Sequence, residues 1–164
     1  MGALVAAAFD LSVHIRTDDF ARFLVSGWID PWRADSAHQN DVQGAAAAAA
    51  AIQFAVGGYT VVFDGHFFPE GIEGMVQMCQ QRAVPVHYAV LRADLNTCLA
   101  RAAQRGPGAG RFTFDAKRLT QLHARFADLG VYEAHTIEAS RAAQEVAETV
   151  LTAFARGRLE AHPR

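Results

Sequence analysis

Acidic side chains stand at the ends of two short segments that the sequence predicts to be β-strands. Asp18 and Asp19 follow the strand-like segment Leu11–Arg16, and Asp64 ends the apolar run that begins at Tyr59. In open parallel sheets, ligands bind outside the carboxyl ends of the strands, so we expect these carboxylates to share one edge. An acid at such an edge can hold Mg²⁺, or take a proton from a substrate hydroxyl during phosphoryl transfer.

Each of these acids also has a plain structural interpretation. Asp64, which precedes Gly65, is the candidate Mg²⁺ ligand, and the alternative is a helix N-cap or turn aspartate. One of Asp18 and Asp19 is the candidate proton acceptor, and the other is then a helix cap or an ion-pair partner. His66 follows closely and could touch a substrate or a phosphate.

Three arginines flank a glycine-rich break that is centred on residues 106–110. Arg101 and Arg105 are four residues apart and therefore share one face of a predicted helix, and Arg111 follows the break. Arginines on a mobile lid can clamp phosphates, so residues 101–114 form a candidate lid. The alternative is an ordinary solvated face.

An aromatic loop follows the first acids. Trp28 and Trp32, with Phe20 and Phe23, could line an apolar substrate pocket beside Asp18, or they could pack as core and rim. The first interpretation favours an apolar or ring-bearing alcohol as the small-molecule substrate.

The loop that should hold the phosphates of a nucleotide does not occur in the sequence. No segment matches G-x-x-x-x-G-K-[ST], and no glycine-rich loop leads into Lys117, the one lysine of the chain. The histidines show no zinc-site spacing, and Ser26-Gly27 lacks the context of a hydrolase nucleophile.

Length and composition predict one soluble globular domain over residues 1–164. The net charge of −2 gives no reason to expect nucleic acid as a partner, and no apolar run is long enough for a membrane span. Cys79 and Cys98 lack the spacing of a disulfide framework, so we expect free thiols in a reducing cytoplasm.

Strand-like and helix-like segments alternate, which predicts an α/β fold with a parallel sheet. We expect helical N-caps at Thr17 or Asp18 and at Asp115, and we expect the strand at Tyr59–Phe63 to be buried on both faces. Strands are predicted at 11–16, 59–63, 84–91 and 134–138, and helices at 2–9, 36–56, 70–82, 95–105, 115–129 and 142–155.

Several segments together resemble small bacterial P-loop kinase-like proteins. These proteins are often labelled AAA-family ATPases and are related to chloramphenicol phosphotransferase and to shikimate and gluconate kinases. The resemblance covers nearly all of the chain, and it rests on five segments: Val13-His14-Ile15-x-x-Asp18-Asp19-Phe20, Ser26-Gly27-Trp28-Ile29-Asp30-Pro31-Trp32, Gly57-Gly58-Tyr59-Thr60-Val61-Val62-x-Asp64-Gly65, Leu99-Ala100-Arg101-Ala102-x-x-Arg105-Gly106 and His123-x-x-Phe126-Ala127-Asp128-Leu129-Gly130.

The resemblance implies roles for the candidate residues, with ATP and Mg²⁺ as cofactors. Asp18 would be the substrate-facing acid, and Asp64 would lie on the Walker B-type strand. Arg101 and Arg105 would belong to the adenine-side helix and lid, and Arg111 would be a further lid arginine. The implied fold is a three-layer P-loop NTPase-like parallel sheet.

The chain departs from this family at its front, where the family has a strand, the phosphate loop and a helix. Only the end of that helix, Gly2–Phe9, has a counterpart here. In the usual strand order 2-3-1-4-5, the central strand would be missing. We therefore expect an N-terminally truncated sheet, which reflects either a gene start placed too late or a true loss.

These observations predict an ATP-dependent phosphotransferase acting on a small-molecule hydroxyl, or a derivative of one with little activity. The alternative is a non-catalytic remnant that serves as a binding protein and self-associates through strand edges left open. A third class, metal-dependent hydrolysis by Asp18, Asp64 and His66, has the least support.

Overall fold

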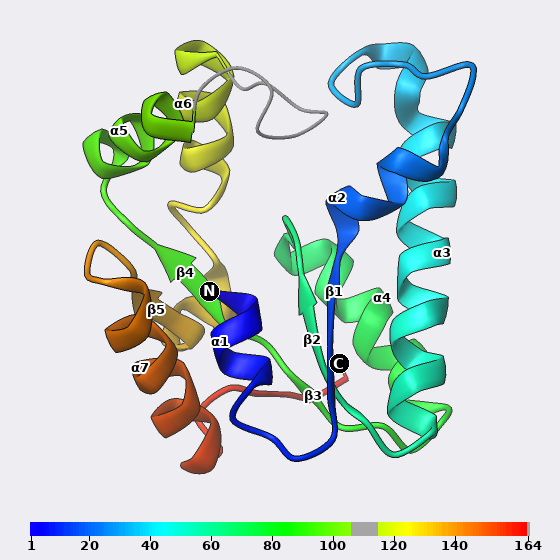
Figure 1. Cartoon of the computed structure of the whole chain (residues 1–164), viewed down its shortest axis with the longest axis vertical. Coiled ribbons are helices and arrows are strands. Elements are labelled where there is room, and N and C mark those ends of the chain that lie inside the picture. Colours follow the sequence, from blue (N-terminus) through cyan, green and yellow to red (C-terminus); the bar gives the residue numbers. More distant parts are fainter. Residues whose placement is uncertain (106–114, 164) are drawn as a thin grey trace. The chain divides into compact units, whose positions relative to one another are not determined.

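The computed structural model describes residues 1–105 and 115–163, and the chain divides into two compact units (Figure 1). The N-terminal unit comprises Gly2–His66, and the C-terminal unit comprises Met1 with Phe67–Arg164. Each unit contains helices and its own parallel pair of strands, so the α/β class predicted from the sequence is confirmed.

The N-terminal unit is built around the parallel pair of β1 and β2. The pairing is in register, with Ser12 opposite Thr60 and Arg16 opposite Asp64. The unit consists of α1 (Gly2–Ala6), β1 (Ser12–Arg16), α2 (Thr17–Phe20), 3-10 turns at Ala21–Phe23 and Ala34–Ser36, α3 (Ala37–Val56) and β2 (Thr60–Asp64).

The two faces of this strand pair carry different side chains, because alternate residues of a strand point to opposite faces. His14 shares its face with Asp64, and α1 covers that face: Gly2 lies against the His14 ring, and Ser12 donates a hydrogen bond to the carbonyl of Ala6. Figure 1 shows α1 and α3 on opposite sides of β1 and β2.

The alanine run lies within the long helix α3. Ala47, Ala48 and Ala51 are buried, at 0 to 6% exposure. Their small side chains let the helix backbone approach its neighbours closely, and alanine has the highest helix propensity. Gly57 and Gly58 follow the helix, and the positive φ of Gly58 (89°) suits glycine at the turn into β2.

The C-terminal unit combines one parallel and one antiparallel strand pair. β4 (Val90–Arg92) pairs in parallel with β5 (Thr136–Glu138), and β3 (Val86–His87) pairs antiparallel with β6 (Glu160–Ala161). Its helices are α4 (Pro69–Gln80), α5 (Leu95–Arg105), α6 (Ala116–Arg125) and α7 (Ala143–Ala155), with a 3-10 helix at Gly130–His135.

Large buried side chains concentrate in the C-terminal unit. One cluster includes Tyr88, Leu129 and Tyr132, and a second surrounds Ile137 and Leu159, each 1% exposed. Among the described residues of the N-terminal unit, by contrast, the buried apolar side chains are alanines and Ile15. None of the described helices is long and apolar enough to cross a bilayer.

Most predicted helices are confirmed within a few residues, and the N-cap at Asp115 is confirmed because its carboxylate accepts the Arg118 backbone N–H at 2.7 Å. The cap predicted at Thr17 or Asp18 is wrong, since α2 begins at Thr17 and Arg16 occupies the N-cap position. The strand runs directly into this helix without a capping side chain.

Three strand predictions need correction. Residues 84–91 form two short strands, β3 and β4, with different partners, rather than one strand. The strand predicted at 134–138 forms as β5 at Thr136–Glu138, but it is not the last strand, because β6 follows α7. The strand at 59–63 is only half-buried, since β2 has one hydrogen-bonded neighbour, β1, in the described sheet.

Truncation of the buried core residue Ile137 to alanine is expected to lower the free energy of unfolding by about 3 kcal/mol, from lost apolar contacts and the cavity left behind. Leu91→Ala is the matched control: Leu91 lies opposite Ile137 in the strand pair but is 43% exposed, so its loss should cost under about 1 kcal/mol. Urea unfolding followed by circular dichroism measures both. Equal costs would contradict the burial difference.

Candidate functional site

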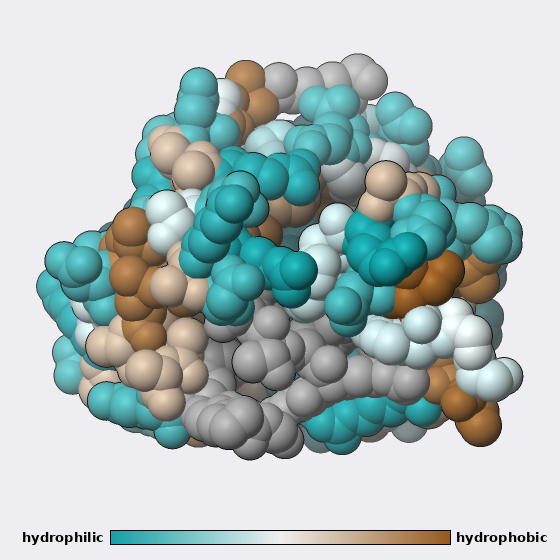
Figure 2. Space-filling view, turned by 90° about the horizontal axis from the view of Figure 1, so that it is seen from above, coloured by the Kyte–Doolittle hydropathy of each residue, from teal (hydrophilic) through white to brown (hydrophobic). Residues whose placement is uncertain are grey.

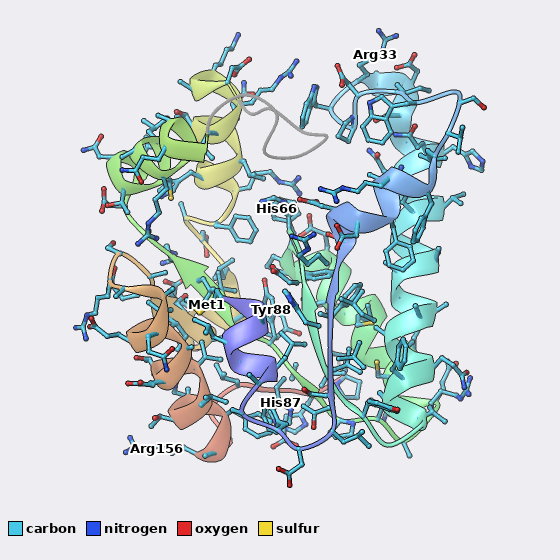
Figure 3. The ribbon with its side chains drawn as sticks, viewed as in Figure 1. Met1, Arg33, His66, His87, Tyr88 and Arg156 are labelled. Carbon is cyan, nitrogen blue, oxygen red and sulfur yellow. The ribbon has the colours of Figure 1, made fainter. Side chains whose placement is uncertain are left out.

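The carboxyl end of the β1–β2 pair brings the candidate acids together. Arg16 and Asp64 are register partners at the last position of both strands, and α2 starts directly after β1. Asp18 and Asp19, in the first turn of α2, therefore lie at the edge where Asp64 ends β2. His66 also lies at this end of the pair (Figure 3).

Asp19 is held by an arginine from β1. The Arg16 Nε and Nη2 atoms donate to the two Asp19 carboxylate oxygens at 2.8 and 2.6 Å, and Arg22 lies 3.9 Å from the same carboxylate. The hydrogen bond from Arg16, followed by the charges of nearby basic groups, lowers the pKa of Asp19. Of the two acids Asp18 and Asp19, Asp19 is thus the one that forms the ion pair with Arg16.

Asp18 is the acid that stays open to solvent. It is exposed, and within the described chain its carboxylate forms no hydrogen bond or ion pair. Asp19 contributes most to the raised pKa of Arg16, but the charges of Asp64 and Asp18 raise it too. All three acids therefore act electrostatically on the Arg16 guanidinium.

Asp64 has a partner that the sequence reading missed. The His14 Nε2 atom lies 3.3 Å from one Asp64 carboxylate oxygen, and the side chains are 21% and 52% exposed. His14 and Asp64 stand two positions apart on one face of the paired strands, since His14 is opposite Val62. Because side chains alternate along both predicted strands, the sequence indicates which residues of each strand share a face. Only the register of the pairing shows that His14 and Asp64 lie close together.

A magnesium ion fits the chemistry of this edge. Among the described residues no group of three or more His, Cys, Asp or Glu side chains is arranged to hold a metal ion. Mg²⁺ does not need such a cage, because it keeps several waters and is usually held by one or two carboxylates with substrate phosphates. Asp64, half exposed and with one carboxylate oxygen outside the His14 contact, can provide such a ligand.

The aromatic loop is pinned to the start of α3. The Gln39 side chain bonds both the N–H and the carbonyl of Ile29, at 2.9 and 2.7 Å, and Ser36 and Asn40 both donate to the Pro31 carbonyl. These bonds fix the loop that carries Trp28 and Trp32, two half-buried residues.

Apolar side chains remain exposed beside this loop. Phe20 and Phe23 pack edge to face with centroids 5.3 Å apart, yet Phe23 is 72% exposed and Val25 is 95% exposed. Figure 2 views this end of the N-terminal unit from above and shows brown side chains among teal ones on the right. The predicted aromatic substrate wall thus corresponds to a surface that is partly exposed.

The three arginines predicted to act on phosphates, Arg101, Arg105 and Arg111, belong to the C-terminal unit. The Arg101 guanidinium donates to the carbonyls of Ala139, Ser140 and Arg141 at 2.6 to 3.0 Å, which fixes the turn between β5 and α7. Arg105 is the last residue of α5, and its side chain lies outside the described part of the structure. Arg111 and most of the candidate lid also lie outside the described residues.

Comparison of the chain with protein-family models and with curated proteins found no match. The interpretation of the site therefore depends on its own geometry.

The pKa of Asp19 is expected to rise when Arg16→Gln removes its partner. Because the folded pKa is lowered, the pair stabilises the chain above the unfolded pKa of about 3.9, and this contribution is lost as the pH falls through the folded value. Carboxyl ¹³C NMR titration measures the shift. Arg33→Gln is the matched control, since it removes the equivalent fork on Asp35 and should leave Asp19 unchanged.

Proposed function

We propose that this chain is an ATP-dependent phosphotransferase for a small-molecule hydroxyl, or a derivative of one, and that its N-terminal unit carries the acceptor side. The observation that carries this proposal is the convergence of Asp18 and Asp64 at the carboxyl end of one parallel strand pair, with Asp19 engaged by Arg16. A proton acceptor and a Mg²⁺ ligand at one sheet edge are what phosphoryl transfer needs.

The proposed fold is a P-loop NTPase-like sheet whose central strand is missing. Two parallel pairs support it, β1–β2 and β4–β5, each in a different unit. In a strand order of 2-3-1-4-5, these pairs correspond to strands 2-3 and 4-5, and strand 1 has no counterpart among the described residues. The half-buried state of β2 agrees with an edge that lacks a neighbour.

In the proposed reaction, Asp18 accepts the proton of the substrate hydroxyl while the hydroxyl oxygen attacks the γ-phosphorus of ATP. The bond to the bridging oxygen breaks, and ADP leaves with that electron pair. Asp64 would hold the Mg²⁺, which would supply neutralisation of the phosphate charge. Arg105 and Arg111 are the proposed charge clamps, whereas the geometry favours Arg101 as the residue that holds the 139–141 turn.

We expect the 164-residue chain to transfer phosphate from ATP at a rate near background, because the sequence contains neither the backbone nest nor the lysine that bind β- and γ-phosphates. If the natural protein is active, Asp18→Asn should lower kcat by about 10²- to 10⁴-fold. Radiolabelled phosphate transfer to a panel of alcohols measures both. Asp35→Asn is the control and should leave kcat unchanged, because Asp35 is another exposed acid of the N-terminal unit but is paired with Arg33.

The mass of the natural protein from its source cells separates the two forms of this proposal. A mass a few kilodaltons above 17.7 kDa, with a G-x-x-x-x-G-K-[ST] peptide in the excess, supports an active kinase. A matching mass supports a non-catalytic derivative. Strong ATP-dependent transfer by the 164-residue chain that survives Asp18→Asn would refute the assigned roles.

A second candidate function is a binding protein that self-associates. The exposed side chains of Phe23 and Val25 favour it, together with the half-buried strand β2. Analytical ultracentrifugation is expected to show concentration-dependent dimers that weaken in Phe23→Ser and persist in Val131→Ser, where Val131 is a comparably exposed residue of the C-terminal unit. A monomer at all concentrations would count against this function.

A further inference from the structure

The face of β1 that α1 covers holds a histidine with no role in the predicted site. Gly2 packs so closely on the His14 imidazole that a Cβ atom at Gly2 would lie 2.3 Å from Nε2 and 2.8 Å from Cδ2. A Cβ atom at that separation would force the ring or the helix to shift, so glycine at this position lets α1 lie directly against the ring. Gly2 forms one wall of the site, and the Asp64 carboxylate stands at the Nε2 atom.

The chemistry of the pair fixes the direction of the hydrogen bond. An ionised carboxylate only accepts hydrogen bonds, so the Nε2 atom of His14 must carry the proton that it donates to Asp64 at 3.3 Å. This bond engages one carboxylate oxygen. The other oxygen of Asp64 has no hydrogen bond or ion pair within the described chain, and the side chain is 52% exposed.

We infer that His14 is a positioning residue that orients the Asp64 carboxylate, so that its second oxygen faces a divalent cation at the strand edge. This inference rests on the proposed Mg²⁺ role of Asp64. Groups that hydrogen-bond a metal-ligating carboxylate fix its orientation, and their loss lowers metal affinity about 10- to 100-fold. The His14 ring is half-buried and packs against Gly2, and these contacts restrict its position beside Asp64.

Paramagnetic broadening by Mn²⁺ alone tests the inference on the full chain. In the wild-type chain, Mn²⁺ should broaden the Gly65 amide signal, and Asp64→Asn should abolish this effect. His14→Phe keeps a ring against Gly2 but removes the donor, and it should require about 10- to 100-fold more Mn²⁺ for equal broadening. His38→Phe, which alters an exposed histidine of the same unit, is the matched control and should titrate like the wild type.

The outcomes separate the inference from the proposed function. One outcome is that Asp64→Asn abolishes the broadening while His14→Phe needs no more Mn²⁺ than the wild type. That result would overturn the positioning role of His14 and leave Asp64 as the metal ligand. If Mn²⁺ broadens no signal near Asp64 in the wild type, the metal assignment fails and the inference fails with it.

A measurement on the wild-type ring covers the case in which His14→Phe does not fold. Imidazole ¹⁵N spectra of the neutral ring should show the proton on Nε2, and Asp64→Asn should shift the His14 signals. A proton on Nδ1 would overturn the positioning role of His14. His14 signals that do not change in Asp64→Asn would overturn it as well.

Discussion

The N-terminal unit depends on the in-register parallel pairing of β1 with β2. Five consecutive residue pairs, from Ser12 with Thr60 to Arg16 with Asp64, fix which side chains share a face and which side chains end together. A slip of one residue would move His14 away from Asp64 and reverse the face that each apolar side chain presents. The position of every candidate group at this edge follows from that register.

Charge pairing gives different surroundings to the acids that the register brings together. Arg16, which lies opposite Asp64, donates two hydrogen bonds to the Asp19 carboxylate, and Asp18 remains exposed. A bidentate arginine restrains a carboxylate in one orientation, which suits a structural acid more than a proton acceptor. Two adjacent aspartates of equal chemistry thus acquire different environments, because one arginine can saturate only one of them.

Packing differs between the two units. The C-terminal unit buries large side chains such as Leu129, Ile137 and Leu159, whereas the N-terminal unit buries mainly alanines of α3. Small side chains permit close approach of helix and strands but contribute less apolar burial. In the N-terminal unit, Phe23 and Val25 remain exposed, at 72% and 95%.

The sequence by itself determined the element types, because these depend on neighbours a few residues away. The alanine run predicts α3, the paired glycines predict its end, and the β-branched runs predict β1 and β2. Even the convergence of Asp18 and Asp64 could be predicted, since it requires only parallel strands. Short strands such as β6 escaped prediction, because two residues carry too little pattern.

Only the tertiary structure decided the partners of the individual side chains. His14 meets Asp64 from fifty positions away, and Arg101 reaches the carbonyls of residues 139–141 from a similar separation. Local spacing alone predicts neither contact, because each depends on strand register or helix packing. Residue types therefore indicated which chemistry was available, whereas long-range contacts decided which groups remained open to perform it.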